Sequence, residues 1–575
     1  PNPVCMSVFH RIRSESAEGL YQKHNSMLRS AIEALHTRAF FAQFNESAKA
    51  YGEEAEPAGK AAFEGQLGQP FDRLQQTHDG WLSAAEASPY TTEPLGISYP
   101  YLKDPLAYIA KAQSAGETWK RLLPRARAGI LLEALSRLSE RFFEVALATQ
   151  HTTGQAYMMA FQAAGPHAAD RALEAIALGY QEQTRFPDHV NWQKPTGKTT
   201  IHLDKQFLVV PKGVALAIGC STFPIWNSLP GIFASLVTGN PVIVKPHPLA
   251  IYPLAIPIAI VQQVLVELGL SPDTVQLATD TPEAPITKVL AEHPAVKIID
   301  FTGSNAFGDY IEALPGKATF TEKAGVNSVI VDSTDDLEAM AQNIGFSLCL
   351  YSGQMCTAPQ NIYIPKDGIL VKGERVPYAA VAEALTKAVA GLATHPKAGP
   401  AVLGAIQNPA TADRIAAASG LGAKVLLESQ AVANPDFPNA RTASPMLLEV
   451  GPSQRALTER EHFGPIAFVV PTESTQESIA LATQNARAHG AISAGAYTTN
   501  PETLTQMAEA LAEAGVTTSF NLTGGVYINQ NAAFSDLHVS GANPAGNASL
   551  TNPEFVLRRF TLVGVKLNMP QPPTP

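Results

Sequence analysis

Short apolar segments that suit strands alternate with longer segments of helical character through much of this chain. The first series of apolar segments comprises residues 214–218, 242–244, 275–277 and 296–301. A second alternation runs from 328 to 497, with strand-like segments such as 328–331 and 466–470. Strands that alternate with helices over such lengths predict parallel sheets covered by helices. The chain is therefore expected to be an α/β protein, and 575 residues suggest roughly three to four domain-sized units.

The composition and charge of the chain argue against several classes of protein. Hydrophobic residues make up 45% and charged residues 16%, which allows a large packed core. The net charge of -10 argues against a nucleic-acid partner, because there is no excess of basic side chains to neutralise phosphates. Proline and glutamine interrupt the longest apolar stretch, residues 251–270, so no membrane span is expected. The first 13 residues contain no long apolar run, which predicts no secretory signal and a cytoplasmic location.

One of the four cysteines follows a turn that could present it as a nucleophile. Cys5, Cys220, Cys349 and Cys356 form no C-x-x-C pair and fit no zinc motif, so neither a metal site nor a disulfide scaffold is predicted. Cys356 comes directly after Ser-Gly-Gln-Met, and the glycine at 353 permits a sharp turn and a close approach of substrate. An inert buried thiol is the alternative, unless the chain supplies a base and a cofactor site.

Two further motifs predict a place for a phosphate-containing ligand. Gly303 and Ser304 stand between the strand at 296–301 and a helical stretch, where backbone N–H groups can hold phosphate. Lys245 ends the strand at 242–244, and strand carboxyl ends line the ligand crevices of open α/β sheets. The G-x-G-x-x-G fingerprint of dinucleotide-binding folds is absent from the sequence.

Two glutamates in apolar surroundings complete the set of candidates. Glu322 precedes the strand at 328–331, and an apolar setting would raise its pKa and make it a general base. Glu461 and Phe463 belong to a turn before the strand at 466–470, where the carboxylate could hold a ribose and the ring could pack on a base. Each of these glutamates could also be an ordinary surface or turn residue.

The order and spacing of these motifs resemble the aldehyde dehydrogenase superfamily over about residues 95–565. Cys356 follows Glu322 by 34 residues, which matches the family spacing of nucleophile and general base. The resemblance implies oxidation of an aldehyde through a thiohemiacetal and a thioester on the cysteine. It assigns the catalytic positions to Cys356, Glu322 and Thr222, the last as the oxyanion position. It assigns NAD(P) binding to Lys245, His247, Gly303, Ser304, Glu461 and Phe463.

The resemblance also implies a division of the chain and an oligomeric state. The expected parts are a Rossmann-type NAD(P)-binding domain (96–192 and 212–325), a catalytic domain (326–530) and a small β oligomerisation element (193–211 and 545–575). Residues 1–95 are expected to form a helical extension or arm. A homodimer or a dimer of dimers follows by analogy.

Three departures and choices affect the expected chemistry. Thr222 stands where the family has an oxyanion asparagine, and Asn227, about 140° further round a helix, is a poor replacement. Pro248 stands where NAD-preferring relatives carry a glutamate, which favours NADP over NAD. Within the superfamily the chain resembles members of phenylacetic acid degradation, which suggests a semialdehyde of aromatic catabolism, free or linked to CoA, as substrate. Two alternatives are a CoA-acylating dehydrogenase and a degenerate, non-catalytic family member.

Overall fold

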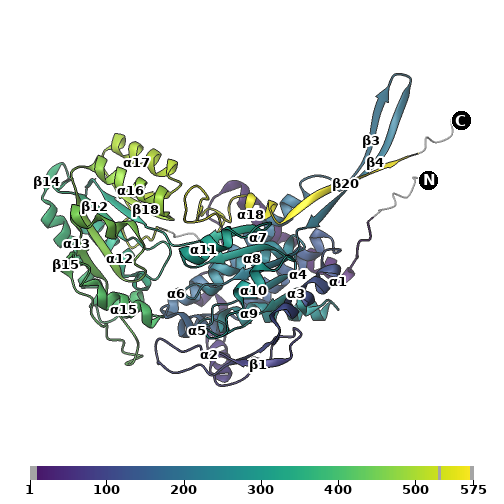
Figure 1. Cartoon of the computed structure of the whole chain (residues 1–575), viewed down its shortest axis with the longest axis horizontal. Helices are drawn as coiled ribbons and strands as arrows, with labels where there is room; N and C mark the ends of the chain where they lie inside the picture. The colour runs from purple at the N-terminus through teal and green to yellow at the C-terminus, as the bar shows by residue number, and fades with distance from the viewer. Residues whose placement is uncertain (1–8, 529–532, 570–575) are drawn as a thin grey trace.

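The computed structural model describes residues 9–528 and 533–569, which form two α/β bodies and a projecting β arm (Figure 1). Cys5, residues 529–530 of the predicted catalytic domain and residues 570–575 of the predicted oligomerisation element lie outside the described residues. No helix in the described part of the chain is long and apolar enough to cross a membrane.

The larger body contains a five-stranded parallel sheet in the order β7-β6-β5-β8-β9. Its strands are β5 (Val214–Ile218), β6 (Val242–Lys245), β7 (Val275–Leu277), β8 (Val296–Thr302) and β9 (Ala318–Glu322). The intervening helices are α8 (Pro224–Val237), α9 (Tyr252–Glu267), η3 (Pro272–Thr274), α10 (Thr287–Glu292) and α11 (Asn305–Glu312). The chain adds strands on one side of β5 and then on the other, so β5 and β8 flank a topological switch point, where such sheets bind ligands.

Helices that precede the five-stranded sheet in the sequence complete the larger body, and this sheet is called the first sheet below. The helices are α3 (Pro105–Trp119), α4 (Pro124–Ser139), α5 (Phe142–Thr153), α6 (Tyr157–Gln162), the π-helical turn η2 (Ala163–His167) and α7 (Ala168–Thr184). Most of α7 is buried, because it packs on both α8 and α4.

Residues 9–95, expected as an extension or arm, pack into the core of the larger body. They form α1 (Glu15–Thr37), η1 (Ala48–Tyr51), α2 (Ala55–Gln66) and β1 (Gly80–Ser83), and β1 pairs with β2 (Ser98–Tyr101). Helix α1 packs on α4 and α7, and α2 packs on α5. The buried Glu86 accepts hydrogen bonds from the first backbone N–H groups of α9, from Ile251 (2.7 Å) and Tyr252 (2.9 Å). Residues before 95 therefore help to hold the helices behind the first sheet.

The smaller body is built on a seven-stranded sheet in the order β15-β16-β17-β12-β10-β18-β19, parallel except for β15. These strands are β10 (Ser328–Val331), β12 (Asn361–Pro365), β15 (Lys424–Leu427), β16 (Met446–Glu449), β17 (Ile466–Thr472), β18 (Ser493–Tyr497) and β19 (Thr517–Phe520). A small sheet adds β11 (Ser333–Thr334), β13 (Ile369–Val371) and β14 (Glu374–Val376). The helices are α12 (Leu337–Cys349), η4 (Leu350–Gly353), α13 (Tyr378–Ala393), α14 (Ala398–Leu403), α15 (Pro409–Ala418), η5 (Pro452–Glu459), α16 (Thr475–His489) and α17 (Pro501–Glu513).

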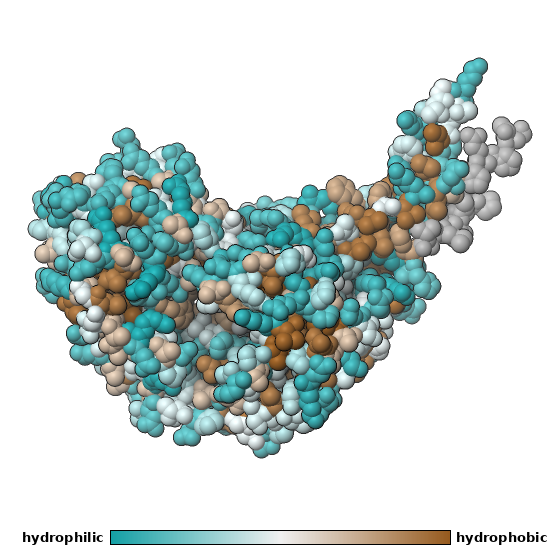
Figure 2. Space-filling model, in the orientation of Figure 1, coloured by the Kyte–Doolittle hydropathy of each residue, from teal (hydrophilic) through white to brown (hydrophobic). Residues whose placement is uncertain are grey.

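The arm is a three-stranded antiparallel sheet that extends away from both bodies (Figure 1). It consists of β3 (His189–Thr196), β4 (Thr199–Pro211) and β20 (Phe560–Asn568), with β4 in the middle. Apolar side chains lie along its base (Figure 2), and Leu562 and Val563 are about half exposed at 45% and 47%.

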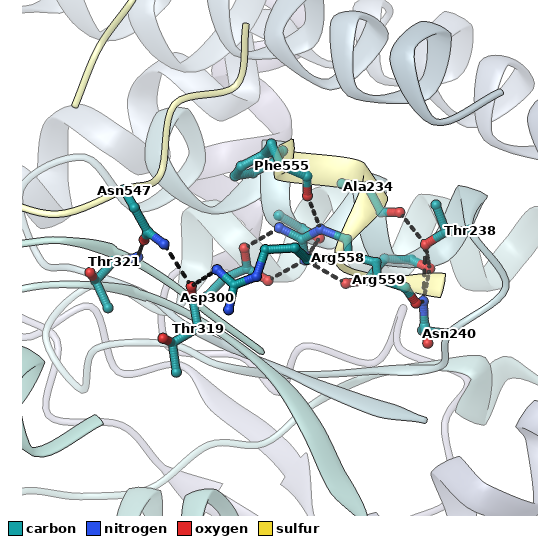
Figure 3. A network of polar contacts seen from close by, with 12 residues as sticks. Ala234, Thr238, Asn240, Asp300, Thr319, Thr321, Asn547, Phe555, Arg558 and Arg559 are labelled. Atoms are coloured by element: carbon teal, nitrogen blue, oxygen red, sulfur yellow. Dashed lines mark hydrogen bonds and ion pairs between the residues drawn. The ribbon is translucent and has the colours of Figure 1, made fainter. Parts of the chain in front are cut away.

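The segment before β20 is fastened to the first sheet by a buried arginine. Arg559 makes two hydrogen bonds of 2.7 Å to the carboxylate of Asp300 on β8, and its own carbonyl accepts one from Asn240 (Figure 3). Upstream of α18 (Glu554–Leu557), Asn547 bonds the backbone of Thr321 and Thr319 on β9. Residues 545–559, expected in the oligomerisation element, thus lie against the first sheet.

Candidate active site

All nine residues predicted for the site line one cavity of about 570 Å³. The cavity lies beyond the carboxyl ends of β5, β6, β8 and β9, and its opposite wall comes from the smaller body. The nine residues are Thr222, Lys245, His247, Gly303, Ser304, Glu322, Cys356, Glu461 and Phe463.

A rigid turn presents Cys356. Tyr351, Ser352 and Gly353 have φ of 48°, 49° and 64°, so three consecutive residues adopt the left-handed conformation. Gln354 fixes the turn with a 2.9 Å hydrogen bond from its amide nitrogen to the carbonyl of Ala405. A Cβ at Gly353 would lie 2.5 Å from the carbonyl oxygen of Gly464. Gly353 therefore leaves room for the neighbouring turn, which carries Glu461 and Phe463. The sequence had predicted that this glycine leaves room for a substrate.

Cys356 and Glu322 meet at a third side chain, His538, that the sequence analysis missed. His538 Nε2 lies 2.9 Å from Glu322 Oε1 and 3.5 Å from Cys356 Sγ. The ligand-type atoms of the three residues all lie within 4.8 Å of one another. His538 is separated from these two residues by 216 and 182 positions, so no local pattern pointed to it.

The electrostatics of this group differ from the expectation for Glu322. Burial alone would raise the pKa of Glu322, but the charge and hydrogen bond of His538 outweigh burial and lower it, so the predicted raised pKa is wrong. Burial would lower the pKa of His538, yet the Glu322 carboxylate raises it. Burial and Glu322 together raise the pKa of Cys356 well above its ordinary value. The resting group is therefore a thiol beside a carboxylate–imidazolium pair.

Thr222 lies in the loop after β5, and its carbonyl accepts a 2.8 Å hydrogen bond from the side chain of Gln155. Asn227 stands on the first turn of α8, where its amide nitrogen donates to the sulfur of Cys220 at 3.4 Å. The Asn227 amide nitrogen is thus engaged with a different cysteine, although Asn227 also lines the cavity.

The other end of the cavity carries charged groups on strand ends. Lys245 Nζ and Asp280 Oδ1 form a buried ion pair of 2.7 Å. Burial, with the nearby Lys245 charge, lowers the pKa of His247 to about 4. Ser304 caps α11, accepting a 3.4 Å hydrogen bond from the N–H of Phe307. Burial raises the pKa of Glu461 to about 7, and one of its oxygens accepts a 3.3 Å bond from the N–H of Gly325.

This donor set fits a dinucleotide. The N-terminus of α11 and the Lys245 ammonium suit phosphate oxygens, while the buried carboxylates of Asp280 and Glu461 suit ribose hydroxyls. Asp280 follows β7, the strand that pairs with β6, so parallel pairing brings its carboxylate beside Lys245.

A second cavity of about 330 Å³ reaches Cys356 from the other side. Its lining is largely apolar and aromatic, with Met159, Phe223, Trp226, Phe346, Leu350 and Tyr527 among its residues. Cys356 and Phe223 line both cavities, so the thiol lies where the polar and the apolar chamber meet. Such an arrangement can bring an apolar substrate and a cofactor to one nucleophile.

Residues 85–553 match the sequence pattern of the aldehyde dehydrogenase family. The chain therefore belongs to this family. The solved structure of an NAD-dependent aldehyde dehydrogenase from Burkholderia multivorans is 46% identical, with a TM-score of 0.93 over 97% of this chain and 100% of that one. These matches confirm the predicted superfamily, its α/β fold and the class of enzyme.

Curated relatives are more distant. The vanillin dehydrogenase of Pseudomonas fluorescens is 27% identical over 392 residues, 66% of this chain and 75% of that protein. The 1-pyrroline-5-carboxylate dehydrogenase of Geobacillus thermodenitrificans is 30% identical over 270 residues, 44% of this chain. The match covers 48% of that relative, so the chain spans about half of its length.

Proposed function

We propose that this protein oxidises a hydrophobic aldehyde to the carboxylic acid, with Cys356 as nucleophile and Glu322 as general base. One observation carries the proposal: the Cys356 thiol lines both a polar cavity suited to a dinucleotide and an apolar cavity suited to an aldehyde. Family membership and the NAD-dependent relative from Burkholderia multivorans support it.

Cys356 and Glu322 share the steps of the proposed reaction. The thiol proton passes to Glu322, and the sulfur attacks the aldehyde carbon to give a thiohemiacetal. The Cys356 backbone N–H and the Thr222 hydroxyl are the candidate donors for its oxygen. When bound, NAD(P) supplies the hydride acceptor that turns the thiohemiacetal into a thioester. After Glu322 has released the thiol proton to solvent, its carboxylate removes a proton from the water that attacks the thioester, and the C–S bond breaks with its electron pair returning to the Cys356 sulfur; capture followed by hydrolysis is the usual two-step logic of covalent catalysis.

The cofactor proposal follows from Asp280. Pro248 stands where NAD-preferring relatives carry a glutamate, and the lack of that carboxylate favoured NADP. Asp280, however, supplies a carboxylate at the end of the adjacent strand. A carboxylate repels the 2′-phosphate of NADP and accepts hydrogen bonds from the 2′-hydroxyl of NAD. We therefore propose NAD as the preferred cofactor, in line with the NAD-dependent relative. A comparison of kcat/KM for the two cofactors tests this choice.

The substrate proposal rests on the apolar cavity and on a resemblance to the phenylacetic acid degradation protein PaaN. Among the described residues, the cavity lining contains aromatic and aliphatic side chains and neither lysine nor arginine. A CoA-linked semialdehyde therefore has to place its acyl end in the cavity and its phosphates outside it. Vanillin dehydrogenase supports an aromatic aldehyde as the simpler substrate. Rates with phenylacetaldehyde and with a CoA-thioester semialdehyde distinguish the two.

The nucleophile is tested by Cys356→Ala. We expect turnover to fall to the background rate, because no thiohemiacetal forms, while the Kd for NAD measured by calorimetry stays within about twofold. Cys349→Ala is the matched control, since Cys349 is buried against α13 and lines neither cavity. Aldehyde oxidation that survives in Cys356→Ala would reject the proposed nucleophile.

Two alternatives have different products. In a CoA-acylating dehydrogenase the thioester passes to free CoA, so product analysis with and without CoA separates it from the proposed hydrolysis. A degenerate family member would oxidise no aldehyde at all. Glu322 beside the thiol favours hydrolysis, because a general base is needed to activate water.

We propose that the protein forms a homodimer, or a dimer of dimers, through the arm. Strand β20 is an edge strand of nine residues, and edge strands with exposed apolar side chains favour pairing with another chain. The second copy of the arm is the proposed occupant of this edge.

A further inference from the structure

His538 lies between the two groups that the proposed mechanism uses. Its Nε2 is the one ring atom in contact with both the Glu322 carboxylate, at 2.9 Å, and the Cys356 sulfur, at 3.5 Å. Only 3% of the His538 side chain is exposed. The imidazole thus has direct access to the reacting sulfur, and bulk water has little.

The other ring nitrogen also faces a carboxylate. His538 Nδ1 lies 4.0 Å from Asp536 Oδ2, an oxygen without a hydrogen-bond partner among the described residues. One carboxylate thus forms a hydrogen bond with Nε2 and a second faces Nδ1 within ion-pair distance, and two negative groups beside the ring favour its imidazolium form. The Trp226 ring makes an edge contact with the His538 ring, with 5.1 Å between the two ring centroids. The Arg171 guanidinium lies above the Trp226 ring, and its positive charge opposes the protonation of His538.

A thiolate at Cys356 needs such a cation. Burial without a partner makes an anion costly, and Glu322 is a second negative group beside the sulfur. Deprotonation therefore becomes favourable only if the proton is taken up locally and a positive charge remains next to the sulfur.

We propose that His538, as an imidazolium, is a catalytic residue that stabilises the Cys356 thiolate. The S–H bond of Cys356 breaks, an O–H bond forms on Glu322, and the electron pair stays on sulfur. The Nε2–H of His538, no longer needed by the neutral Glu322, then donates to the thiolate. The three side chains together carry no net charge before or after this transfer, so no proton has to leave the buried site. The direction of the His538 pKa, raised by Glu322, agrees with an imidazolium.

The thiolate pair is independent of any aldehyde, and only its use in forming the C–S bond rests on the proposed function. In that step the sulfur pair bonds to the carbonyl carbon, and the C=O π pair moves to the oxygen. Measurements on the free enzyme therefore separate the two proposals.

The test is the rate at which iodoacetamide alkylates Cys356 as a function of pH, without aldehyde or cofactor, followed by mass spectrometry of the Cys356 peptide. In His538→Gln, which keeps a hydrogen-bond donor but loses the charge, we expect alkylation at pH 7 to be at least about tenfold slower. Its pH profile should move to higher pH by about one unit or more. His538→Lys, which restores a cation, should recover part of the rate.

His24→Gln is the matched control. His24 is also buried and also pairs with a glutamate, at 2.6 Å from Glu133, but it lies on α1 and lines neither cavity. Its alkylation profile should be that of the wild type. If His538→Gln does not fold, Asp536→Asn keeps the imidazole and should shift the profile in the same direction by less.

A His538→Gln profile that superimposes on the wild-type profile, with only a lower Tm, would overturn the proposal, because a structural role alone moves stability and not thiol reactivity. A shifted profile in a protein that oxidises no aldehyde would support the thiolate pair and overturn the proposed function.

Discussion

At the residue scale, the side chains of Lys245 and Asp280 determine the charge beside the ribose of a bound cofactor. The two side chains form their 2.7 Å ion pair on adjacent parallel strand ends and are both buried. Asp280 Oδ2 also accepts a 3.0 Å hydrogen bond from the N–H of Ile286. The carboxylate is therefore held in place without a cofactor, ready to accept a hydroxyl and to repel a phosphate.

The first prediction tests this carboxylate with Asp280→Asn. The amide keeps the shape and one acceptor but removes the charge, so the ratio of kcat/KM for NADP to that for NAD should rise about tenfold, or ~1.4 kcal/mol. Steady-state kinetics with both cofactors measure the ratio. Asp273→Asn is the control, because Asp273 is a buried aspartate at the amino end of β7, bonded to Thr77 and outside the cavity. An unchanged ratio in Asp280→Asn would remove Asp280 from cofactor choice.

Site residues could be predicted from the sequence only where their residue type and spacing matched a family pattern. Cys356, Glu322 and Lys245 follow such spacing. Asp280 and His538 do not, because each reaches the site through strand pairing or chain return over long separations. The lowered pKa of Glu322 was hidden for the same reason, since its cause is His538.

At the scale of elements, α1 is tied to α4 by polar side chains that surround the buried carboxylate of Glu133. The Glu133 carboxylate on α4 is bound by Lys23 at 2.9 Å and His24 at 2.6 Å from α1, and by Arg137 at 3.0 Å from its own helix. Burial alone would raise the pKa of Glu133, but these three hydrogen bonds lower it to about 2. The ionised carboxylate therefore stabilises the contact between the N-terminal helix and the core.

The second prediction is a pH dependence of this contact. Because the folded pKa lies below the unfolded one, Glu133 contributes its full stability above pH ~4.5 and loses it as the pH falls toward 2. Glu133→Gln should lower the free energy of unfolding at pH 7 by about 1 to 2 kcal/mol, allowing for solvent screening. Urea unfolding followed by circular dichroism measures it.

The difference between Glu133→Gln and wild type should shrink below pH ~4.5. Glu33→Gln, at an exposed position on α1, is the control and should change stability little at any pH. A constant difference between pH 7 and pH 3 would contradict the role of the ionised carboxylate.

The element pattern of both sheets was predictable, because each buried parallel strand is a short apolar run. The role of residues 1–95 was not. Their helices read as an extension in the sequence, but Phe63 on α2 stacks on Tyr252 of α9, and α1 covers α4. Amphipathic helices reveal which face they bury, and not the surface that they bury it against.

The whole molecule places its site between two bodies and its arm outside them (Figure 1). Residues of the arm pair in register over all of β20, from Phe560 opposite Pro211 to Asn568 opposite Leu203. Within residues 9–528 and 533–569, no strand pairs with the outer edge of β20, and Leu562 and Val563 are exposed. At this scale the prediction concerns assembly.

The third prediction is that Leu562→Glu combined with Val563→Glu dissociates the oligomer. Two charges on the exposed edge oppose pairing with a second copy, so light scattering after size exclusion should report the mass of a single chain. Leu370→Glu, at an apolar position 40% exposed on β13 of the smaller body, should keep the wild-type mass. A wild type that is already a monomer would contradict the proposed interface.

The sequence by itself determined the α/β architecture, the family and the nine cavity-lining residues, because apolar periodicity and motif spacing are local properties of the chain. The tertiary structure alone decided that His538 joins Cys356 to Glu322, that Asp280 stands beside Lys245, and that residues 9–95 belong to the core. These facts depend on which distant segments come into contact. Burial and charge at such contacts set the protonation of the site, and one-dimensional spacing does not record them.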